Sequence, residues 1–172
     1  EGWFEERAEE EAKMNKGILH LLIGPAASGK SSWAGAHLTG TEIVSSDQMR
    51  RELTGDPTDQ SQNYLVFQRC VEHLREMLKD GREVTFDATN CREELREDPV
   101  QAARWSGAEI HAYFFDVSLQ ECLRRNLRRH RSVPEQVIQR HFRLLTPPRL
   151  YEADRHHRIG PEGNVALYWP HR

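Results

Sequence analysis

The sequence predicts an α/β protein in which a mostly parallel sheet of about five strands is covered by helices on both faces. Short apolar runs typical of buried strands alternate along the chain with longer segments whose apolar residues recur at helical spacing. The length of 172 residues suits one domain with a sizeable core. We therefore predict one folded domain over residues 17–172, preceded by an acidic helical linker over residues 1–16 that follows an upstream domain.

The first half of the domain contains two predicted strands. Residues 17–24, GILHLLIG, form a near-continuous apolar run typical of a buried parallel strand. A glycine- and serine-rich turn leads into the short helix KSSWAGAHL, and TEIVSS predicts the second strand. Residues 47–53 predict a short helix that ends at the breaker-rich loop TGDPTDQSQ. A longer helix over residues 64–79 follows, with Gly81 as its end signal.

The second half continues this alternation. EVTFDATN predicts the third strand, and CREELREDPVQAARWSG predicts a helix that kinks or restarts at Pro99. AEIHAYFFDV predicts the fourth strand, and residues 118–130 a helix with Ser118 as its N-cap. Pro134 is predicted as the first residue of the helix PEQVIQRHFRLL. No regular element is predicted in TPPRLYEADRHHRIGPEGN, and a last strand is predicted at VALYWP.

The composition excludes several classes of protein. No apolar run approaches the roughly 20 residues that cross a membrane, and the acidic start of the chain is no secretory signal. Cys70, Cys91 and Cys122 show no CxxC spacing, so we expect reduced core residues in a cytoplasmic protein and no zinc ribbon. Between Arg124 and Arg158 ten arginines accompany only three acidic residues, which favours phosphate contact over a solvated helix face.

The strongest functional signal is GPAASGKS, residues 24–31, which matches the phosphate-binding pattern G-x-x-x-x-G-K-[ST]. Such a match arises by chance on the order of 1% of the time in a chain of this length, and the predicted strand before it and helix after it fit its context. Glycines let backbone amides face a phosphate, and the helix dipole points at the anion. The pattern therefore predicts a site for a nucleoside triphosphate. The expected nucleotide-binding residues are Gly24, Ala26, Ala27, Ser28, Gly29, Lys30, Ser31 and Ser32.

Side chains with distinct roles are expected around this loop. Lys30 is expected to reach the β- and γ-phosphates, and the hydroxyl of Ser31 to bind Mg²⁺ directly. Asp87 ends the third strand and Asp47 follows the second, so both are expected at the carboxyl ends of the parallel strands, where open sheets bind ligands. Either carboxylate is a candidate to hold Mg²⁺ through water. Asp87 is also a candidate to hydrogen-bond Ser31 or to cap the following helix, and the sequence leaves these readings open.

Asp47 and Arg50 lie three residues apart, so in a helix their side chains share one face. A carboxylate at this position can accept the proton of an acceptor hydroxyl as it attacks the γ-phosphate. An arginine one turn on can bind an anion of the acceptor, and a hydroxyl with its own phosphate nearby describes the 5′ end of a nucleic acid. The alternative is an N-capping aspartate with a surface ion pair, and the spacing alone does not choose between them.

The chain also resembles a known family. GPAASGKS, SSDQMR, TDQ at residues 58–60, DATN and RNLRR occur in the order seen in polynucleotide 5′-kinases, and the resemblance runs from about residue 17 to about residue 141. This family includes the phage enzyme, the kinase module of the bacterial RNA-repair kinase/phosphatase and the kinase half of the HD-domain polynucleotide kinases. The resemblance implies a P-loop kinase-like fold with an arginine-bearing lid, ATP as phosphate donor, and Mg²⁺. The residues after Leu145 match nothing in the family, and no DxDxT phosphatase motif occurs.

The resemblance also implies residue roles. Asp47 matches the general base, and Arg50 matches the arginine that grips the acceptor phosphate. Arg125 and Arg129 match the lid arginines that contact the donor phosphates, although the neighbouring arginines at positions 124, 128 and 131 are close enough to exchange roles with them. The expected substrate-binding residues are Asp47, Arg50, Asp87, Thr89 and Asn90.

The leading hypothesis is a kinase that uses ATP and Mg²⁺ to phosphorylate the 5′-hydroxyl end of DNA or RNA in end healing, fused in its full length to a phosphatase or another repair domain. The aromatic residues Trp33, Tyr64 and Phe67 either stack a terminal base or belong to the core, and the core is favoured. One alternative is a small-molecule kinase that acts on a sugar, nucleoside or antibiotic and does not need Arg50. Another is a nucleotide-binding module without transfer chemistry, which does not need Asp47.

Overall fold

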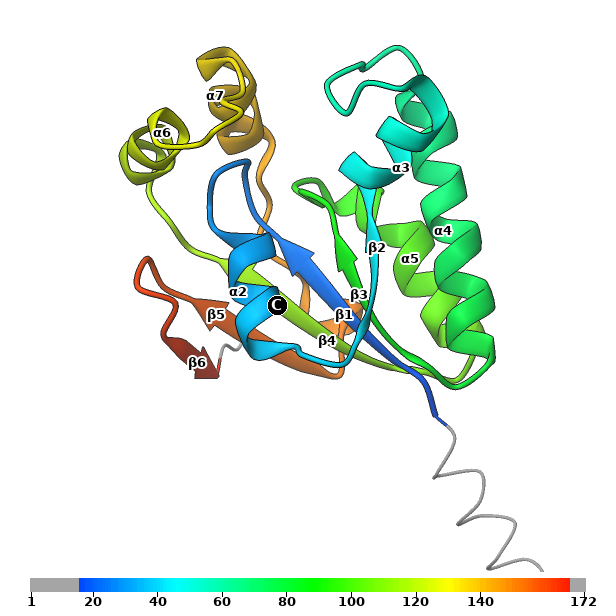
Figure 1. Cartoon of the computed structure of the whole chain (residues 1–172). Helices are drawn as coiled ribbons and strands as arrows, with labels where there is room; N and C mark the ends of the chain where they lie inside the picture. The colour runs from blue at the N-terminus through cyan, green and yellow to red at the C-terminus, as the bar shows by residue number, and fades with distance from the viewer. Residues whose placement is uncertain (1–15, 168–172) are drawn as a thin grey trace, which may run out of the picture.

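The computed structural model of the chain describes residues 16–167, so residues 1–15 and 168–172 lie outside the described part. The linker helix expected over residues 1–16 falls almost entirely outside it, and the domain boundary stays a prediction. The strands form one six-stranded sheet in the order β2-β3-β1-β4-β5-β6 (Figure 1). Their bounds are β1 Ile18–Ile23, β2 Glu42–Ser45, β3 Glu83–Asp87, β4 Glu109–Phe115, β5 Arg155–Ile159 and β6 Val165–Leu167.

The sheet is parallel except at one edge. The pairs β2·β3, β3·β1, β1·β4 and β4·β5 are parallel, and β6 runs antiparallel to β5. This confirms the predicted α/β class with a mostly parallel sheet. The absence of a predicted element in residues 146–164 was wrong, because β5 lies there with the sequence RHHRI. That segment lacks an apolar run, and it forms a strand because the edge of β4 offers it backbone partners, from His111 opposite Arg155 to Phe115 opposite Ile159.

Helices cover both faces of the sheet, as predicted. In Figure 1, α4 and α5 lie against one face, α2 lies in front of the other, and α6 and α7 stand above the end of the sheet where the loop after β1 turns. The bounds are α2 Lys30–His37, α3 Ser46–Thr54, α4 Asn63–Lys79, α5 Glu93–Trp105, α6 Leu119–Leu127 and α7 Glu135–Leu144, with a 3₁₀ turn η1 at Leu150–Glu152.

The alternation of side chains along β1 divides the core between the two faces. Leu19 and Leu21 point to the side of α4 and α5 and pack in a cluster with Leu74. Leu22 points to the other side and packs with Trp33 of α2 in a second cluster. β1 is therefore buried on both faces, which explains its continuous apolar sequence.

The helix ends follow local sequence signals closely. The hydroxyl of Ser118 accepts a hydrogen bond from the backbone N–H of Glu121 at 3.2 Å, which confirms the predicted N-cap of α6. Gly81 follows α4 with φ +74, and its N–H donates to the carbonyl of Leu78 at 3.1 Å. Pro134 is the N-cap of α7 and not its first residue, because its ψ of 138° is extended. α5 continues through Pro99 without a restart.

Two further expectations concern the chain as a whole. Within residues 16–167 no helix has the length and the apolar content needed to cross a membrane. Cys70, Cys91 and Cys122 are buried free thiols, as predicted. Burial raises the pKa of the Cys70 thiol to about 12 and that of Cys122 to about 11, so neither is a thiolate at neutral pH.

Candidate active site

The phosphate loop, residues 24–31, joins the end of β1 to the start of α2. Gly29 has φ +93 and Ala27 has φ +63, so the chain turns through the left-handed region twice. A Cβ atom at Gly24 would lie 2.9 Å from the Cβ of Phe115 and 2.9 Å from the hydroxyl oxygen of Ser28. The first and second glycines of the motif are therefore required by packing and by backbone conformation respectively.

Lys30 lies buried at the first turn of α2. Its Nζ donates to the carbonyl oxygen of Gly24 at 2.9 Å and to that of Pro25 at 2.8 Å, so the side chain folds back along the loop. Burial lowers the pKa of Lys30, and the charges of Asp87 and Asp47 act in the opposite direction. An ammonium group held here by carbonyls and carboxylates is well placed for a phosphate of a bound nucleotide.

Ser31 and Asp87 form a direct pair at the end of β3. The hydroxyl of Ser31 donates to Oδ2 of Asp87 at 2.6 Å. Asp87 is not a helix cap, because α5 begins at Glu93 with Arg92 as its N-cap. A hydroxyl oxygen and a carboxylate oxygen suit Mg²⁺, which usually takes few protein ligands and completes its shell with substrate phosphates and water. Within the described residues no group of three or more His, Cys, Asp or Glu side chains is placed to hold a metal ion.

Asp47 lies in the first turn of α3, next to the Ser31–Asp87 pair, because the register of β2 and β3 sets Ser45 opposite Asp87. Ser45 caps this helix through a hydrogen bond from the N–H of Gln48 at 3.3 Å, so the capping role considered for Asp47 is taken by another residue. The side chain of Asp47 is 75% exposed. This carboxylate is therefore open to solvent on the side of the sheet where the strands end.

Arg50 forms the expected ion pair with Asp47, at 2.8 Å, but it is not a surface side chain, since only 11% of it is exposed. Its guanidinium also donates to the carbonyl of Pro57 at 3.3 Å and to Oδ1 of Asn63 at 3.2 Å. Its Nε is buried and has no hydrogen-bond partner among residues 16–167. A guanidinium fixed by the protein next to an exposed carboxylate is suited to an anion of the acceptor.

The arginines of α6 and the connection after it separate into different groups. The Nη1 of Arg125 donates to the carbonyl of Ser28 in the phosphate loop at 3.0 Å, and its Nε donates to Glu121 at 2.7 Å. Arg124 also pairs with Glu121, at 2.6 Å, and is half exposed. Arg129 is exposed after the end of α6. The structure therefore brings Arg125 to the loop and leaves Arg129 on the surface beside it.

Thr89 and Asn90 hold the phosphate loop through the backbone. The N–H of Gly24 donates to the carbonyl of Thr89 at 2.9 Å, and the amide of Asn90 donates to the carbonyl of Leu22 at 2.8 Å. Asn90 is buried and has φ +47. Thr89 therefore contacts the first residue of the loop, and Asn90 contacts the strand that leads into it. Their role in substrate binding stays a prediction.

The three aromatic candidates separate by exposure. Trp33 is buried and Phe67 packs against the main core, as the core interpretation predicts. Tyr64 is 77% exposed, one residue after the Asn63 that holds Arg50, so it is no core residue.

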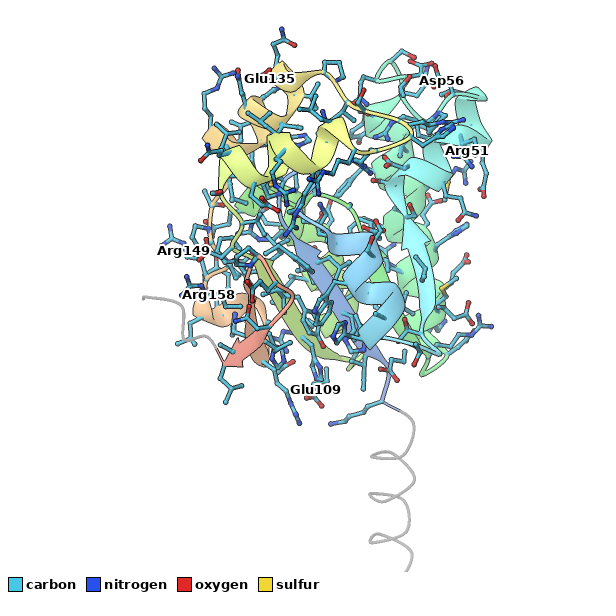
Figure 2. All side chains as sticks on the ribbon, turned by 60° about the vertical axis from the view of Figure 1, so that its left-hand side comes forward. Arg51, Asp56, Glu109, Glu135, Arg149 and Arg158 are labelled. Atoms are coloured by element: carbon cyan, nitrogen blue, oxygen red, sulfur yellow. The ribbon has the colours of Figure 1, made fainter. Side chains whose placement is uncertain are left out.

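Figure 2 shows Arg51 and Asp56, from α3 and the loop after it, on one side of the top of the molecule and Glu135, at the start of α7, on the other.

Two residues that support the site were not identified from the sequence. Arg96 of α5 is fully buried, pairs with Glu152 at 2.7 Å and donates to the carbonyl of Asn90 at 2.9 Å. His141 of α7 accepts a hydrogen bond from the N–H of Ala26 in the phosphate loop at 3.2 Å. Neither position carries a local signal, because an arginine in a charged helix and a histidine in a basic one normally face solvent.

Comparison with known proteins agrees with this geometry. A sequence model of the family described as "AAA domain" matches residues 19–148. Among curated proteins, "Transcription factor bHLH140" of Arabidopsis thaliana is 28% identical over 119 residues, which cover 69% of this chain and only 12% of that protein.

Solved structures with the same fold include kinases of different kinds. A chain of the Pnkp1/Rnl/Hen1 RNA repair complex superposes with a TM-score of 0.66 at 23% identity, covering 76% of this chain and 44% of that one. A gluconokinase from Sinorhizobium meliloti 1021 gives 0.58 at 18% identity, covering 85% and 83%. The Mycobacterium tuberculosis APS kinase CysC, in complex with AMPPNP and APS, gives 0.52 at 22% identity, covering 64% and 69%.

The sequence match and the fold lead to one assignment. The family model covers more than half of the chain and includes the phosphate loop, both carboxylates at the strand ends and the arginine-bearing helix α6. The chain therefore belongs to this AAA domain family, and its fold is the one that these P-loop kinases share.

Proposed function

We propose that the domain transfers the γ-phosphate of ATP to the 5′-hydroxyl end of DNA or RNA, as a polynucleotide 5′-kinase in end healing. The observation that carries this proposal is the Asp47–Arg50 pair of α3, which combines an exposed carboxylate with a nearly buried guanidinium. The carboxylate suits a hydroxyl, and the guanidinium suits an anion attached to the same acceptor. A 5′-terminal nucleotide offers both groups at short range.

On the donor side, the residues act by position and charge, which is what phosphoryl transfer mainly requires. The loop amides and Lys30 hold the β- and γ-phosphates. Ser31 and, through water, Asp87 and Asp47 would hold Mg²⁺, which would supply positive charge to offset the charge of the phosphates. Arg125 turns from the carbonyl of Ser28 to a phosphate oxygen, and Arg129 joins it from the connection between α6 and α7.

On the acceptor side, Asp47 orients the 5′-hydroxyl and accepts its proton as the oxygen attacks the γ-phosphate. Arg50 binds the phosphate that links the terminal nucleotide to the next through the Nη groups of its guanidinium. Because both contacts are to the sugar–phosphate backbone, we expect little preference for base sequence.

A small-molecule P-loop kinase is the second candidate, and the structural similarity to a gluconokinase and an APS kinase supports it. A neutral sugar acceptor would leave Arg50 without an anion, whereas an anionic small molecule would use it. The third candidate, a binding module without transfer, predicts that Asp47 can be replaced without loss of function.

The test is transfer of labelled phosphate from ATP, with Mg²⁺, to a 5′-hydroxyl oligonucleotide, and for comparison to a 5′-phosphorylated oligonucleotide, a nucleoside, gluconate and APS. We expect label only on the 5′-hydroxyl end. Asp47→Asn should lower the rate by about 10²-fold or more while ATP affinity stays nearly unchanged. The matched control is Asp98→Asn, an exposed aspartate of α5, which should act as wild type.

Each other outcome identifies a different candidate. Transfer to a small acceptor and none to the oligonucleotide would contradict the proposal in favour of the second candidate. ATP binding without transfer to any hydroxyl, or full activity of Asp47→Asn, would contradict it in favour of the third. Paired, nicked and single-stranded ends of DNA and RNA in the same assay then define the acceptor.

Partners and location remain part of the proposal. The chain spans 12% of the curated relative and 44% of the repair-complex chain, so fusion to a phosphatase or another repair domain in a longer protein is proposed and not observed. Nucleic acid 5′ ends are the proposed partners. The cytoplasmic location predicted from the unpaired cysteines likewise stays a prediction.

A further inference from the structure

His141 is joined to the phosphate loop in a way that fixes its proton. The backbone N–H of Ala26 points at the Nδ1 of His141 at 3.2 Å. A backbone N–H can only donate, so Nδ1 must be the acceptor and cannot carry a proton. The neutral imidazole therefore carries its proton on Nε2, the nitrogen that does not face Ala26.

Packing holds α7 on the loop and keeps the ring in this position. Ile138, one turn before His141, lies in a buried cluster with Val117 and Cys122, and the side chains of Ala26 and Ala27 pack against that cluster. Two small apolar residues within the phosphate-binding motif thus form the surface on which α7 rests. The ring of His141 is positioned by the same contacts that hold the loop.

The charges around His141 place it near the proposed transfer site. Burial first, and then the charges of Lys30 and Arg140, lower the pKa of His141 to about 4, and the charge of Asp47 acts in the opposite direction. Lys30 and Asp47 are the two residues proposed to flank the terminal phosphate. The imidazole therefore sits within reach of their charges from the side of α7 and remains neutral at neutral pH.

The Nε2–H group is available for a ligand. Within residues 16–167 it makes no hydrogen bond, and it is not one of the fully buried polar atoms that lack a partner. The ring is partly exposed, whereas its Nδ1 is engaged. The Nε2–H is thus a donor without a protein acceptor among the described residues, on a ring that the phosphate loop holds through Nδ1.

We propose that the Nε2–H of His141 donates a hydrogen bond to an oxygen of the terminal phosphate of the bound nucleoside triphosphate. This inference rests on the proposed function in one respect, namely that the ligand is a triphosphate with its last phosphate near Lys30. His141 then completes a set of donors around that phosphate, with Lys30 from α2 and the lid arginine from α6. A neutral donor of this kind stabilises charge on the phosphate without moving a proton.

Two substitutions separate the proposed contact from a purely structural role. In His141→Asn, the side-chain carbonyl can occupy the place of Nδ1 and accept from Ala26, but nothing reaches the place of Nε2. In His141→Gln, the amide nitrogen can occupy the place of Nε2 and donate, but the contact with Ala26 is lost. His73→Asn, an exposed histidine of α4, is the matched control.

The measurement is the affinity of each full chain for Mg²⁺–ATP and Mg²⁺–ADP by titration calorimetry, with thermal unfolding as a check on folding. We expect His141→Asn to lose about tenfold or more in ATP affinity and little in ADP affinity, because only ATP carries the terminal phosphate. His141→Gln should keep most of the preference for ATP over ADP, and His73→Asn should match wild type.

The opposite ranking, with His141→Asn like wild type and His141→Gln impaired, would show that the contact to Ala26 is the whole role and would overturn the proposal. Equal losses for ATP and ADP would also overturn it. No acceptor is present in these titrations, so a failure of the proposed 5′-kinase activity leaves their outcome readable. Conversely, a failed histidine test leaves the transfer assay unaffected.

Discussion

At the residue scale, two neighbouring arginines show how contacts separate side chains that the sequence could not rank. Arg125 and Arg124 both bind Glu121, and hydrogen bonds from Arg124 first and Arg125 second lower the pKa of that carboxyl to about 2. Only Arg125 also reaches the phosphate loop, through the carbonyl of Ser28. Of the two, we therefore assign the phosphate contact to Arg125.

This assignment predicts a difference between two matched variants. Arg125→Ala should weaken ATP binding by about tenfold, since it removes a charged donor at the loop. Arg124→Ala should change the affinity little, because Arg124 is half exposed and its ion pair with Glu121 lies within α6. Titration of ATP into both variants checks this. Equal effects would mean that the arginines exchange roles once a nucleotide is bound.

His141 also predicts how stability depends on pH. Its pKa in the folded protein is about 4, below the ordinary value of 6.5, so the unfolded chain binds more protons between these values. The stability associated with neutral His141 is therefore complete above pH 6.5 and is lost as the pH falls toward 4. His20 and His157, whose pKa values burial also lowers, act in the same direction.

Urea unfolding of wild type and His141→Asn from neutral pH downward isolates this contribution, because the other histidines are common to both proteins. The free energy of unfolding of wild type should fall more steeply with decreasing pH than that of the variant. Parallel curves would show that His141 is as free to protonate in the folded chain as in the unfolded one.

At the scale of elements, Arg96 joins parts of the chain that the sequence keeps far apart. From α5 it pairs with Glu152 of η1 and donates to the carbonyl of Asn90 beside the phosphate loop and to that of Thr146 after α7. Both members of the ion pair are buried. One buried guanidinium therefore ties together α5, η1 and the segment beside the phosphate loop, and these partners satisfy its hydrogen-bond donors.

Breaking this pair should be costly. Arg96→Ala leaves Glu152 as an unpaired buried charge, and we expect it to lower the free energy of unfolding by about 3–5 kcal/mol. Arg104→Ala, on the same helix, removes a part-exposed pair with Asp154 and should cost about 1 kcal/mol or less. Urea denaturation of both variants measures the difference. A similar small loss in both would contradict the supporting role of Arg96.

At the scale of the whole molecule, nucleotide binding should stabilise the fold through the loop that joins its layers. Saturation with Mg²⁺–ATP at about 100 times the dissociation constant adds about 2.7 kcal/mol to the unfolding free energy. We expect a matching rise in the thermal midpoint of wild type and a much smaller rise in Lys30→Met. Chelation of Mg²⁺ should reduce the wild-type shift. An unchanged midpoint would contradict triphosphate binding.

The fold and much of the site were predictable because their signals are local. The phosphate loop is eight consecutive residues, and Asp47 and Asp87 follow strands that the apolar pattern identifies. The remaining features depend on contacts across the chain. His141 meets Ala26 over 115 positions, and β5 is a strand only because β4 lies beside it. No window of sequence contains such contacts, so periodicity and motifs could not reveal them.

The seating of α6 and α7 on the two alanines of the phosphate loop has a mechanical consequence. Moving this helical pair away from the loop would break the hydrogen bond of the Ala26 amide and that of Arg125, and it would expose the apolar cluster around Ile138. The two helices and the phosphate loop therefore form one packing unit, and any shift of the pair would change the loop amide and the arginine together.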